Sequence, residues 1–149
     1  MPTVDKAQTA DIPALVELLA ALFAQEAEFA PDAEAQHRGL AAIIGNPDLG
    51  AILVLREGEG ILGMVNLLYT VSTALGERVA LLEDMVIAPQ SRGKGYGSML
   101  LSEALAFARK EGCKRITLLT DTNNLGAQRF YSKHGFQTSG MMPMRLFLE

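Results

Sequence analysis

The sequence predicts an α+β protein built around a mixed sheet. Strand patterns follow one another in the middle of the chain with no helix between them, which favours antiparallel pairing. The second half then alternates strand, helix, strand, helix and strand, which is typical of a sheet with helices packed against it. Mixed periodicities continue from end to end without a linker or a repeat, so we expect one domain over residues 1–149.

Two helices are expected before the first of these strands. Asp11 can cap the first helix, and Pro13 lies where a missing N–H has little effect. A second helix is expected from Asp32 to Ile44, ended by Gly45-Asn46-Pro47. The apolar face of the first helix follows from side chains that recur at helical spacing: Ile12, Leu15, Val16, Leu19, Leu22 and Phe23.

Three strands are expected in the middle of the chain. Residues 51–56 and 61–73 are apolar runs separated by the turn Glu57-Gly58-Glu59-Gly60, which predicts a hairpin. Residues 78–88 form a third run, which ends at Pro89.

The remaining elements alternate in type. A helix is expected over residues 98–111, with Gly112 as its stop, and a strand over 114–121. A short helix over 125–133 ends before Gly135, and extended chain follows from Phe136. We expect the apolar residues Met141–Met144 and Leu146–Leu148 to form a last strand that covers the core.

Composition excludes several classes of protein. The chain is 49% hydrophobic and has 13 Lys and Arg against 17 Asp and Glu, whereas a general nucleic-acid binder carries a basic surplus. Cys113 is the only cysteine, so an intrachain disulfide and a cysteine-based zinc site are excluded, and we expect no metal. The first residues lack a secretory pattern and no apolar run approaches the ~20 residues of a membrane span, so we expect a cytoplasmic protein.

The strongest local signal is the segment Gln-Ser-Arg-Gly-Lys-Gly-Tyr-Gly at residues 90–97. It follows a predicted strand and opens a helix, so the helix dipole adds positive potential there. Alternating glycines let successive N–H groups converge on one anion, and two cations lie beside them. The segment therefore predicts a phosphate or pyrophosphate site made of Arg92, Gly93, Lys94, Gly95, Tyr96, Gly97 and Ser98.

Glycine-rich segments also occur in plain turns and in nucleotide-binding loops. A simple connecting turn needs fewer glycines and no cations. The nucleotide-binding P-loop pattern cannot be drawn here. A dinucleotide loop is a near match through Gly93, Gly95 and Ser98, with Asp121 as the ribose-binding acid. However, residues 89–92 separate the strand from the first glycine and the third glycine is missing, which disfavours a nicotinamide-dependent oxidoreductase.

Residues 92–97 resemble the R-x-x-G-x-G/A signature of the GNAT superfamily of N-acetyltransferases. Residues 82–89 resemble the fourth strand of that family, and residues 124–136 resemble its N-x-x-A-x-x-F-Y-x-x-x-G-F segment. The specific similarity covers about residues 80–136. It implies a mostly antiparallel twisted sheet flanked by helices on both faces, acetyl-CoA as co-substrate, and a homodimer.

The resemblance also assigns cofactor contacts outside the glycine segment. The pantetheine arm is expected to pair with the main chain of Met85, Val86 and Ile87. A main-chain N–H in that stretch would stabilise the negative charge that develops when an amine attacks the thioester. Asn124 can cap the following helix and also contact the cofactor, and Ala127 belongs to the same motif.

Two proton transfers need catalytic groups. An alkylamine titrates near ~10.4, so a base must take its proton. Glu83 is our first choice, acting through water, and Asp84 is our second. Both lie among apolar residues in the middle of a strand, and strand alternation sends them to opposite faces. A carboxylate held near an apolar surface has a raised pKa and is therefore a better base. An ordinary solvated or ion-paired role remains the alternative for each. Tyr131 occupies the position of the family's acid for the departing thiolate; half-buried packing is its alternative.

These residues predict an N-acetyltransferase that moves an acetyl group from acetyl-CoA to a primary amine by direct attack. The acceptor is expected to be a small-molecule or peptide amine. The acidic residues between the first two helices favour a cationic amine over an anionic sugar phosphate: Glu26, Glu28, Asp32 and Glu34. The alternative is a non-catalytic acyl-CoA-binding module that regulates a partner and transfers nothing.

Overall fold

The computed structural model describes residues 1–24 and 32–149. The chain divides into two compact units, Met1–Leu119 and Thr120–Glu149. Two members of the acidic region expected between the first helices, Glu26 and Glu28, lie outside the described residues. Among the helices that are described, none has the length and apolar character needed to cross a membrane.

The first unit is organised around a five-stranded sheet in the order β1-β2-β3-β4-β5. All neighbouring strands are antiparallel except β4 and β5, which are parallel. This confirms the mixed, mostly antiparallel sheet that the sequence predicts. The strands are β1 (Thr3–Lys6), β2 (Gly50–Glu57), β3 (Gly60–Ser72), β4 (Glu77–Ile87) and β5 (Ile116–Leu118).

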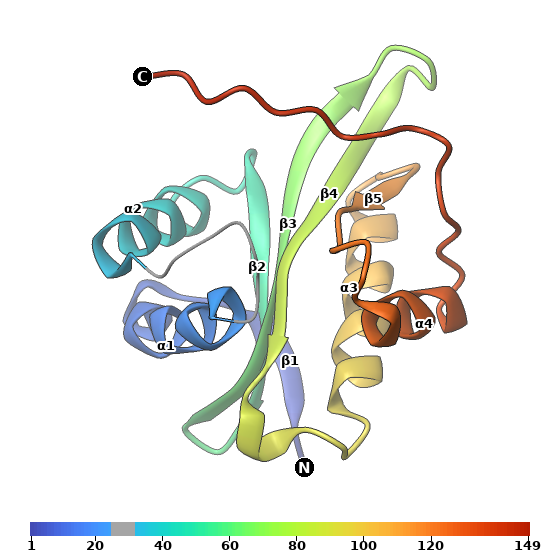
Figure 1. Cartoon of the computed structure of the whole chain (residues 1–149). Coiled ribbons are helices and arrows are strands. Elements are labelled where there is room, and N and C mark those ends of the chain that lie inside the picture. The colour runs from blue at the N-terminus through green and yellow to red at the C-terminus, as the bar shows by residue number, and fades with distance from the viewer. Residues whose placement is uncertain (25–31) are drawn as a thin grey trace. The chain divides into compact units, whose positions relative to one another are not determined.

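Helices cover both faces of the sheet, as expected (Figure 1). Helices α1 (Ile12–Phe23) and α2 (Ala33–Ile44) pack on one face, and α3 (Tyr96–Lys110) packs on the other. The second helix begins where predicted, because the Asp32 side chain accepts a hydrogen bond from the Ala35 N–H at 3.1 Å. Two short 3₁₀ turns, η1 (Thr9–Asp11) and η2 (Pro89–Ser91), precede α1 and α3.

Alternation along the strands divides the core between the two faces. On the face of α1 and α2, Leu15 packs in one cluster with Val54, Met64 and Val86. On the opposite face, the inward side of α3 is buried through Leu100, Leu101, Ala104 and Ala108. Burying one such leucine contributes about 1.5–3 kcal/mol. The sheet is therefore held from both sides, and its central strands are fixed relative to the helices.

The start of the chain differs from the sequence prediction in two ways. Strand β1 was not expected, since it is only four residues long and mostly exposed. The predicted capping role of Asp11 is wrong: its side chain makes no cap hydrogen bond to α1. Instead its carboxylate accepts from the Gln8 N–H at 2.8 Å and from both terminal nitrogens of Arg56 at 3.0 Å. The arginine on β2 draws the carboxylate away from the helix terminus.

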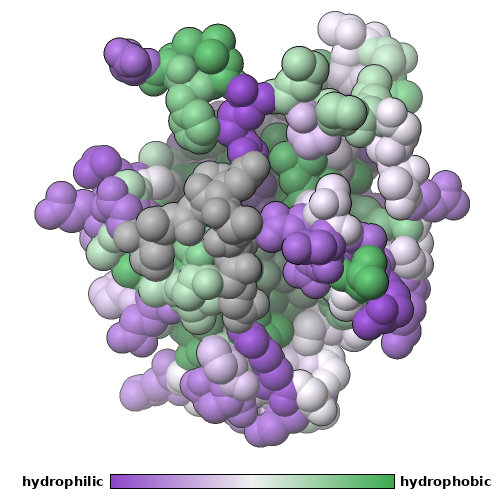
Figure 2. Space-filling model, in the orientation of Figure 1, coloured by the Kyte–Doolittle hydropathy of each residue, from purple (hydrophilic) through white to green (hydrophobic). Residues whose placement is uncertain are grey.

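The second unit contains α4 (Leu125–Lys133), which has the predicted bounds, followed by a segment without regular structure. The expected last strand is wrong, since residues 137–149 form no strand and their apolar side chains are exposed. Figure 2 shows hydrophobic atoms of this segment exposed near the C-terminus. A strand needs a neighbouring strand to pair its backbone, and residues 120–149 contain none.

Arg56 provides a direct test of what the β1–η1–β2 contact contributes. It binds Asp11, whose side chain is 13% exposed, and Asp5, whose side chain is 55% exposed. We expect Asp11→Asn to lower the free energy of unfolding by about 2 kcal/mol and Asp5→Asn by less than about 1 kcal/mol. Urea denaturation of the two variants beside the parent chain measures both values.

The pH dependence supplies the control. Hydrogen bonds from Arg56, and more weakly from Gln8, hold the pKa of the Asp11 carboxyl below its ordinary value despite burial. Its stabilising effect is therefore present above the ordinary value of 3.8 and is lost as the pH falls through the lower folded-state value. The difference in the free energy of unfolding between Asp11→Asn and the parent chain should become smaller below that pH. A difference that stays constant with pH would contradict the ion-pair explanation.

Candidate active site

A β-bulge in β4 shapes the centre of the first unit. Met64 pairs with Val86 and Asn66 pairs with Glu83, so the single residue between them on β3 faces two residues, Asp84 and Met85, on β4. Asp84 has a φ of 53°, and it is the only non-glycine residue with positive φ in the described part of the chain. Such a conformation costs about 1–2 kcal/mol for most residues, although aspartate tolerates it better. The strand is therefore strained at this residue.

The bulge coincides with the separation of β4 from β5. Strand β5 pairs with β4 only at Ala80–Leu82, although the sequence predicts a longer strand over 114–121. Beyond Leu82, β4 continues to Ile87 with no strand partner on that side among the described residues. The main chain of Met85–Ile87 therefore borders an unpaired strand edge that an extended ligand can occupy.

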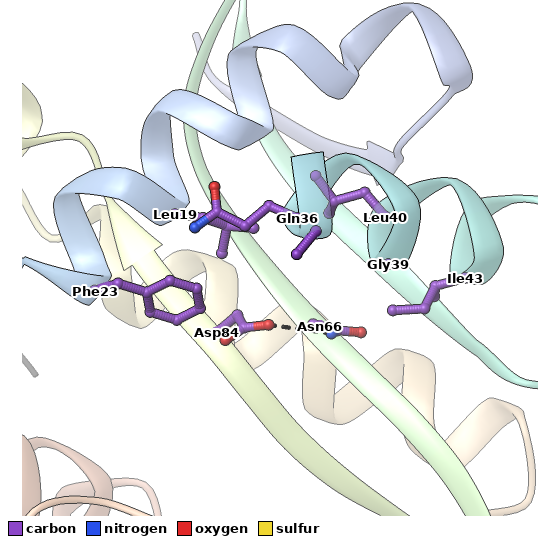
Figure 3. Close-up of a pocket in the computed structure, with 9 residues that line it drawn as sticks. Leu19, Phe23, Gln36, Gly39, Leu40, Ile43, Asn66 and Asp84 are labelled. Atoms are coloured by element: carbon purple, nitrogen blue, oxygen red, sulfur yellow. Dashed lines mark hydrogen bonds between the residues drawn. The ribbon is translucent and has the colours of Figure 1, made fainter. Parts of the chain in front are cut away.

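Asp84 lines a pocket of about 240 Å³ between α1, α2 and the sheet. In Figure 3, Gln36 reaches from α2 toward α1, and the ring of Phe23 lies beside Asp84. The apolar walls are formed mainly by Leu19, Phe23, Leu40 and Ile43. The polar groups are Gln36 of α2, Asn66 of β3 and Asp84 of β4. The pocket therefore combines an apolar lining with a few polar groups, which is typical of a small-molecule site.

The environment of Asp84 favours proton acceptance. Burial raises the pKa of its carboxyl above the ordinary value, and a hydrogen bond from Asn66 opposes part of that rise. The Asn66 amide donates this bond to Asp84 Oδ2 at 3.4 Å (dashed line in Figure 3). A carboxylate whose pKa is raised toward neutrality is a stronger base than an exposed one. Asp84 is thus suited to accept a proton from a group bound in the pocket.

Two polar residues of the pocket were not found from the sequence. Gln36 is 9% exposed and Asn66 is 4% exposed. Both side-chain polar atoms of Gln36 and the Oδ1 of Asn66 are buried without a hydrogen-bond partner. An unpaired buried polar group is destabilising by about 1–3 kcal/mol. The sequence does contain a signal for each of them. Asn66 is an amide in the middle of the apolar run of β3, and Gln36 is an amide on the inward side of α2.

The glycine segment lies between η2 and α3. Gly93 and Gly95 have φ values of 78° and 80°, and nothing lies within 4 Å of a Cβ added to either. Their backbone conformation, rather than crowding, therefore requires glycine. Helix α3 begins at Tyr96, two residues earlier than predicted, so the glycines lead directly into its first turn. The N–H groups of that turn have no intrahelical acceptor, and Arg92 and Lys94 are exposed beside them. This arrangement fits a phosphate group.

The other predicted site residues of the first unit occupy different environments. Glu83 is exposed and does not line the pocket. Met85 and Ile87 are half-buried, and Val86 is buried in the core beneath α1. The Ile87 carbonyl accepts a hydrogen bond from Arg92 Nε at 3.2 Å, which ties the glycine segment to the end of β4. Ser98 is exposed in the first turn of α3.

The remaining predicted residues belong to the second unit. Asn124 caps α4 as expected, with its Oδ1 accepting from the Ala127 N–H at 3.1 Å. Its Nδ2 hydrogens are the atoms with which it could bind a ligand. The Tyr131 ring makes edge contacts with Phe130 and Phe136, with ring centroids 5.3 and 5.6 Å apart. Burial raises the pKa of the Tyr131 hydroxyl to about 12, so at neutral pH it is a proton donor rather than a base.

Comparison with known proteins agrees with this fold. Residues 12–136 match the acetyltransferase (GNAT) family. YhfO, an uncharacterized N-acetyltransferase of Bacillus subtilis, is 33% identical over 89% of this chain and 87% of its own length. The aminoalkylphosphonate N-acetyltransferase of Salmonella typhimurium is 29% identical over 89% of this chain and 83% of its own length.

A solved structure is similar over nearly the whole chain. It is a predicted acetyltransferase from Clostridium acetobutylicum, solved with acetyl-CoA. It superposes with a TM-score of 0.78 over 98% of this chain and 96% of its own length, at 21% identity. At this identity the similarity supports the fold.

Sheet topology, flanking helices and relatives together define an acyltransferase enzyme. Since most of its length matches the family, the chain belongs to the acetyltransferase (GNAT) family. The resemblance stated from residues 80–136 is thereby confirmed.

Asp84 yields a prediction about stability alone. Because burial raises its folded-state pKa, protonation favours the folded chain, and stability falls as the pH rises from the ordinary value of 3.8 through the raised one. Asn keeps the acceptor for Asn66, carries no charge and tolerates positive φ. We therefore expect Asp84→Asn to raise the free energy of unfolding at pH 7 by about 1 kcal/mol, measured by urea denaturation.

The matched control is Asp84→Ala, which removes the same charge. Alanine tolerates positive φ poorly, so this variant should gain less stability than Asp84→Asn, or should lose stability. The advantage of Asp84→Asn should disappear in acid, where both chains are uncharged at this position. A loss of stability in Asp84→Asn at pH 7 would contradict the destabilising effect of a half-buried charge at this position.

Proposed function

We propose that the chain transfers an acetyl group from acetyl-CoA to a primary amine bound in the pocket beside Asp84. The observation that carries the proposal is Asp84 itself: a half-buried carboxylate, strained by the bulge, at the junction of an apolar pocket and an unpaired strand edge. Backbone strain at a charged residue is typical of a functional site.

Acetyl-CoA fits the residues on the other side of this junction. The glycine segment and the first turn of α3 would hold its phosphates, with Arg92 and Lys94 supplying charge. The unpaired edge of β4 from Ile87 back to Asp84 spans about 10 Å, at about 3.3 Å per residue, and would pair with the extended arm. The family match and the acetyl-CoA complex of the Clostridium acetobutylicum protein support this assignment.

Acetyl-CoA supplies a thioester: the N–C bond of the amide forms, the C–S bond breaks, and the sulfur leaves as a thiol carrying one proton. The amine enters the pocket mostly protonated, since alkylamines titrate near ~10.4. Asp84 accepts this proton at a carboxylate oxygen and passes it to solvent, while Asn66 binds the other oxygen of the carboxylate. The nitrogen loses a second proton as the amide forms, which balances the proton that the leaving sulfur takes up.

Two assignments need separate tests. Asp84 replaces Glu83 as our first choice of base, because Asp84 lines the pocket and Glu83 does not. Tyr131 is proposed as the proton donor to the departing sulfur; the family motif and its protonated hydroxyl support this role. A homodimer and a cytoplasmic location stay predictions.

The direct test is thiol release from acetyl-CoA in the presence of a panel of primary amines. We expect turnover with at least one amine, and a fall in kcat of about 10²–10⁴ in Asp84→Asn, the usual contribution of a general base. Glu83→Gln should retain most activity. Tyr131→Phe should lower kcat with little change in the KM for the amine.

The same assay can reject the proposal. Acetyl-CoA binding with no acetyl transfer to any amine would favour the non-catalytic module instead. Full activity in Asp84→Asn together with inactivity in Glu83→Gln would restore Glu83 as the base.

A second experiment tests the glycine segment. Gly95 and Gly76 both have positive φ, and a Cβ added to either meets nothing within 4 Å. Gly76 lies in the turn between β3 and β4, so Gly76→Ala imposes a similar strain away from the segment. We expect both alanine variants to lose about 1–2 kcal/mol of stability. Only Gly95→Ala should raise the KM for acetyl-CoA, by about tenfold, because its strain moves the N–H groups of the site.

An equal rise in KM in both variants would show that general destabilisation, and not the segment, is responsible. Steady-state kinetics at saturating amine, with thermal denaturation of each variant, gives both quantities.

A further inference from the structure

The unpaired amide atoms of the pocket point to the kind of molecule that it binds. Gln36 Oε1, Gln36 Nε2 and Asn66 Oδ1 are all buried without partners, and both residues line the same 240 Å³ space. Two of these atoms accept hydrogen bonds and one donates. Buried polar atoms are normally paired, so a ligand that enters the pocket is expected to pair them.

The orientation of Asn66 is fixed by its neighbour. Its Nδ2 donates to the Asp84 carboxylate, which as an ion can only accept, so Oδ1 faces away from that bond and remains an acceptor. An amine hydrogen satisfies such an atom. Asp84 can therefore accept a hydrogen of the amino group, while Asn66 Oδ1 accepts a hydrogen of a second polar group of the same molecule.

Gln36 offers the complementary pair, a donor and an acceptor on one planar group. A second amide matches this pair with one N–H and one C=O, and needs no charge. A carboxylate or phosphonate can accept from Nε2, but it leaves Oε1 without a donor.

The charge of the pocket points the same way. Among the described lining residues, Asp84 is the only ionisable side chain, and neither Lys, Arg nor His is present. An anionic group bound here would lie near a carboxylate with no counter-charge, which opposes binding. The aminoalkylphosphonate acetylated by the Salmonella typhimurium relative carries such a group.

We propose that the acceptor is a primary amine bearing an uncharged amide and an apolar side chain, with Gln36 as the residue that selects the amide. An amino-acid amide is the simplest member of this class. The proposal rests on the acetyl transfer proposed above. The amino group is held by Asp84, the amide by Gln36 and Asn66 Oδ1, and the apolar side chain by Leu19, Leu40 and Ile43. Bond changes are those given above for the thioester and the amine.

The test uses four amines that share one carbon skeleton and differ only in the group beside the amine. Leucinamide carries an amide, 3-methylbutylamine a hydrogen, leucine a carboxylate, and 1-amino-3-methylbutylphosphonate a phosphonate. We expect kcat/KM to be highest for leucinamide, about tenfold lower for 3-methylbutylamine, and lowest for the two anionic amines. Equal or greater kcat/KM for the phosphonate would overturn the inference.

Gln36→Leu separates selection from folding. It replaces an unpaired buried amide by an apolar group of similar size, so the variant should be at least as stable as the parent. We expect its preference for leucinamide over 3-methylbutylamine to fall about tenfold, to near unity. A retained preference in a folded variant would overturn the role of Gln36.

A binding measurement keeps this inference distinct from the proposed function. In the absence of acetyl-CoA, leucinamide should raise the melting temperature of the parent chain more than leucine does, and Gln36→Leu should lose this difference. Acetylation of 3-methylbutylamine without preference for leucinamide would leave the acetyl transfer standing and reject the inference. Selective binding of leucinamide without acetylation of any amine would support the inference on the acceptor and reject the transfer.

Discussion

The extra residue in β4 is the constraint on which the site depends. It places Asp84 at positive φ, opposite a single residue of β3, and it lies just beyond the last residue that pairs with β5. Strand β5 ends at Leu118, opposite Leu82, so β4 continues past the bulge with one edge unpaired among the described residues. The same local distortion thus orients the carboxylate beside the unpaired edge. In the function proposed above, this one backbone feature would bring the acyl group and the base together.

The surrounding structure must stabilise this distortion. A strained aspartate, its raised pKa and three unpaired amide atoms all act against folding. They are offset on both faces of the sheet: Leu15 and Met64 are completely buried on one side, and Leu100 and Leu101 on the other. Arg56 and Asp11 add an ion pair at the N-terminal end of α1, with both side chains mostly shielded from solvent. Functional sites often contain groups that lower stability, such as strained or unpaired polar residues, and the rest of the fold compensates for them.

The sequence predicted those parts of the fold that depend on local periodicity. The helices over 12–23, 32–44 and 125–133 and the hairpin of β2 and β3 appear where apolar spacing places them.

Strand β1 has too few buried residues to show a pattern, and Asp11 was assigned to a helix terminus because the sequence does not show that Arg56 lies nearby. The tail lacks a pairing strand within its own unit, which no periodicity can reveal. Gln36 and Asn66 could be identified only from the structure, in which the packing of α1 and α2 on the sheet leaves them buried and unpaired. The sequence placed Glu83 and Asp84 on opposite faces, but choosing between them required knowledge of which face carries the pocket.

The glycine segment and the pocket beside Asp84 carry charges of opposite sign. The glycine segment presents Arg92, Lys94 and the positive end of a 15-residue helix, all at the exposed start of α3. The pocket at the other end of the unpaired edge contains a carboxylate and no described cation. A molecule with phosphates at one end and a neutral acyl group at the other can bind in only one direction along this edge, since its phosphates are attracted to the loop and repelled by Asp84. In the function proposed above, the carboxylate would therefore have a second physical effect besides accepting a proton. It would keep anions out of the pocket where the amine is proposed to bind, so that the acceptor and the cofactor would compete little for the same site.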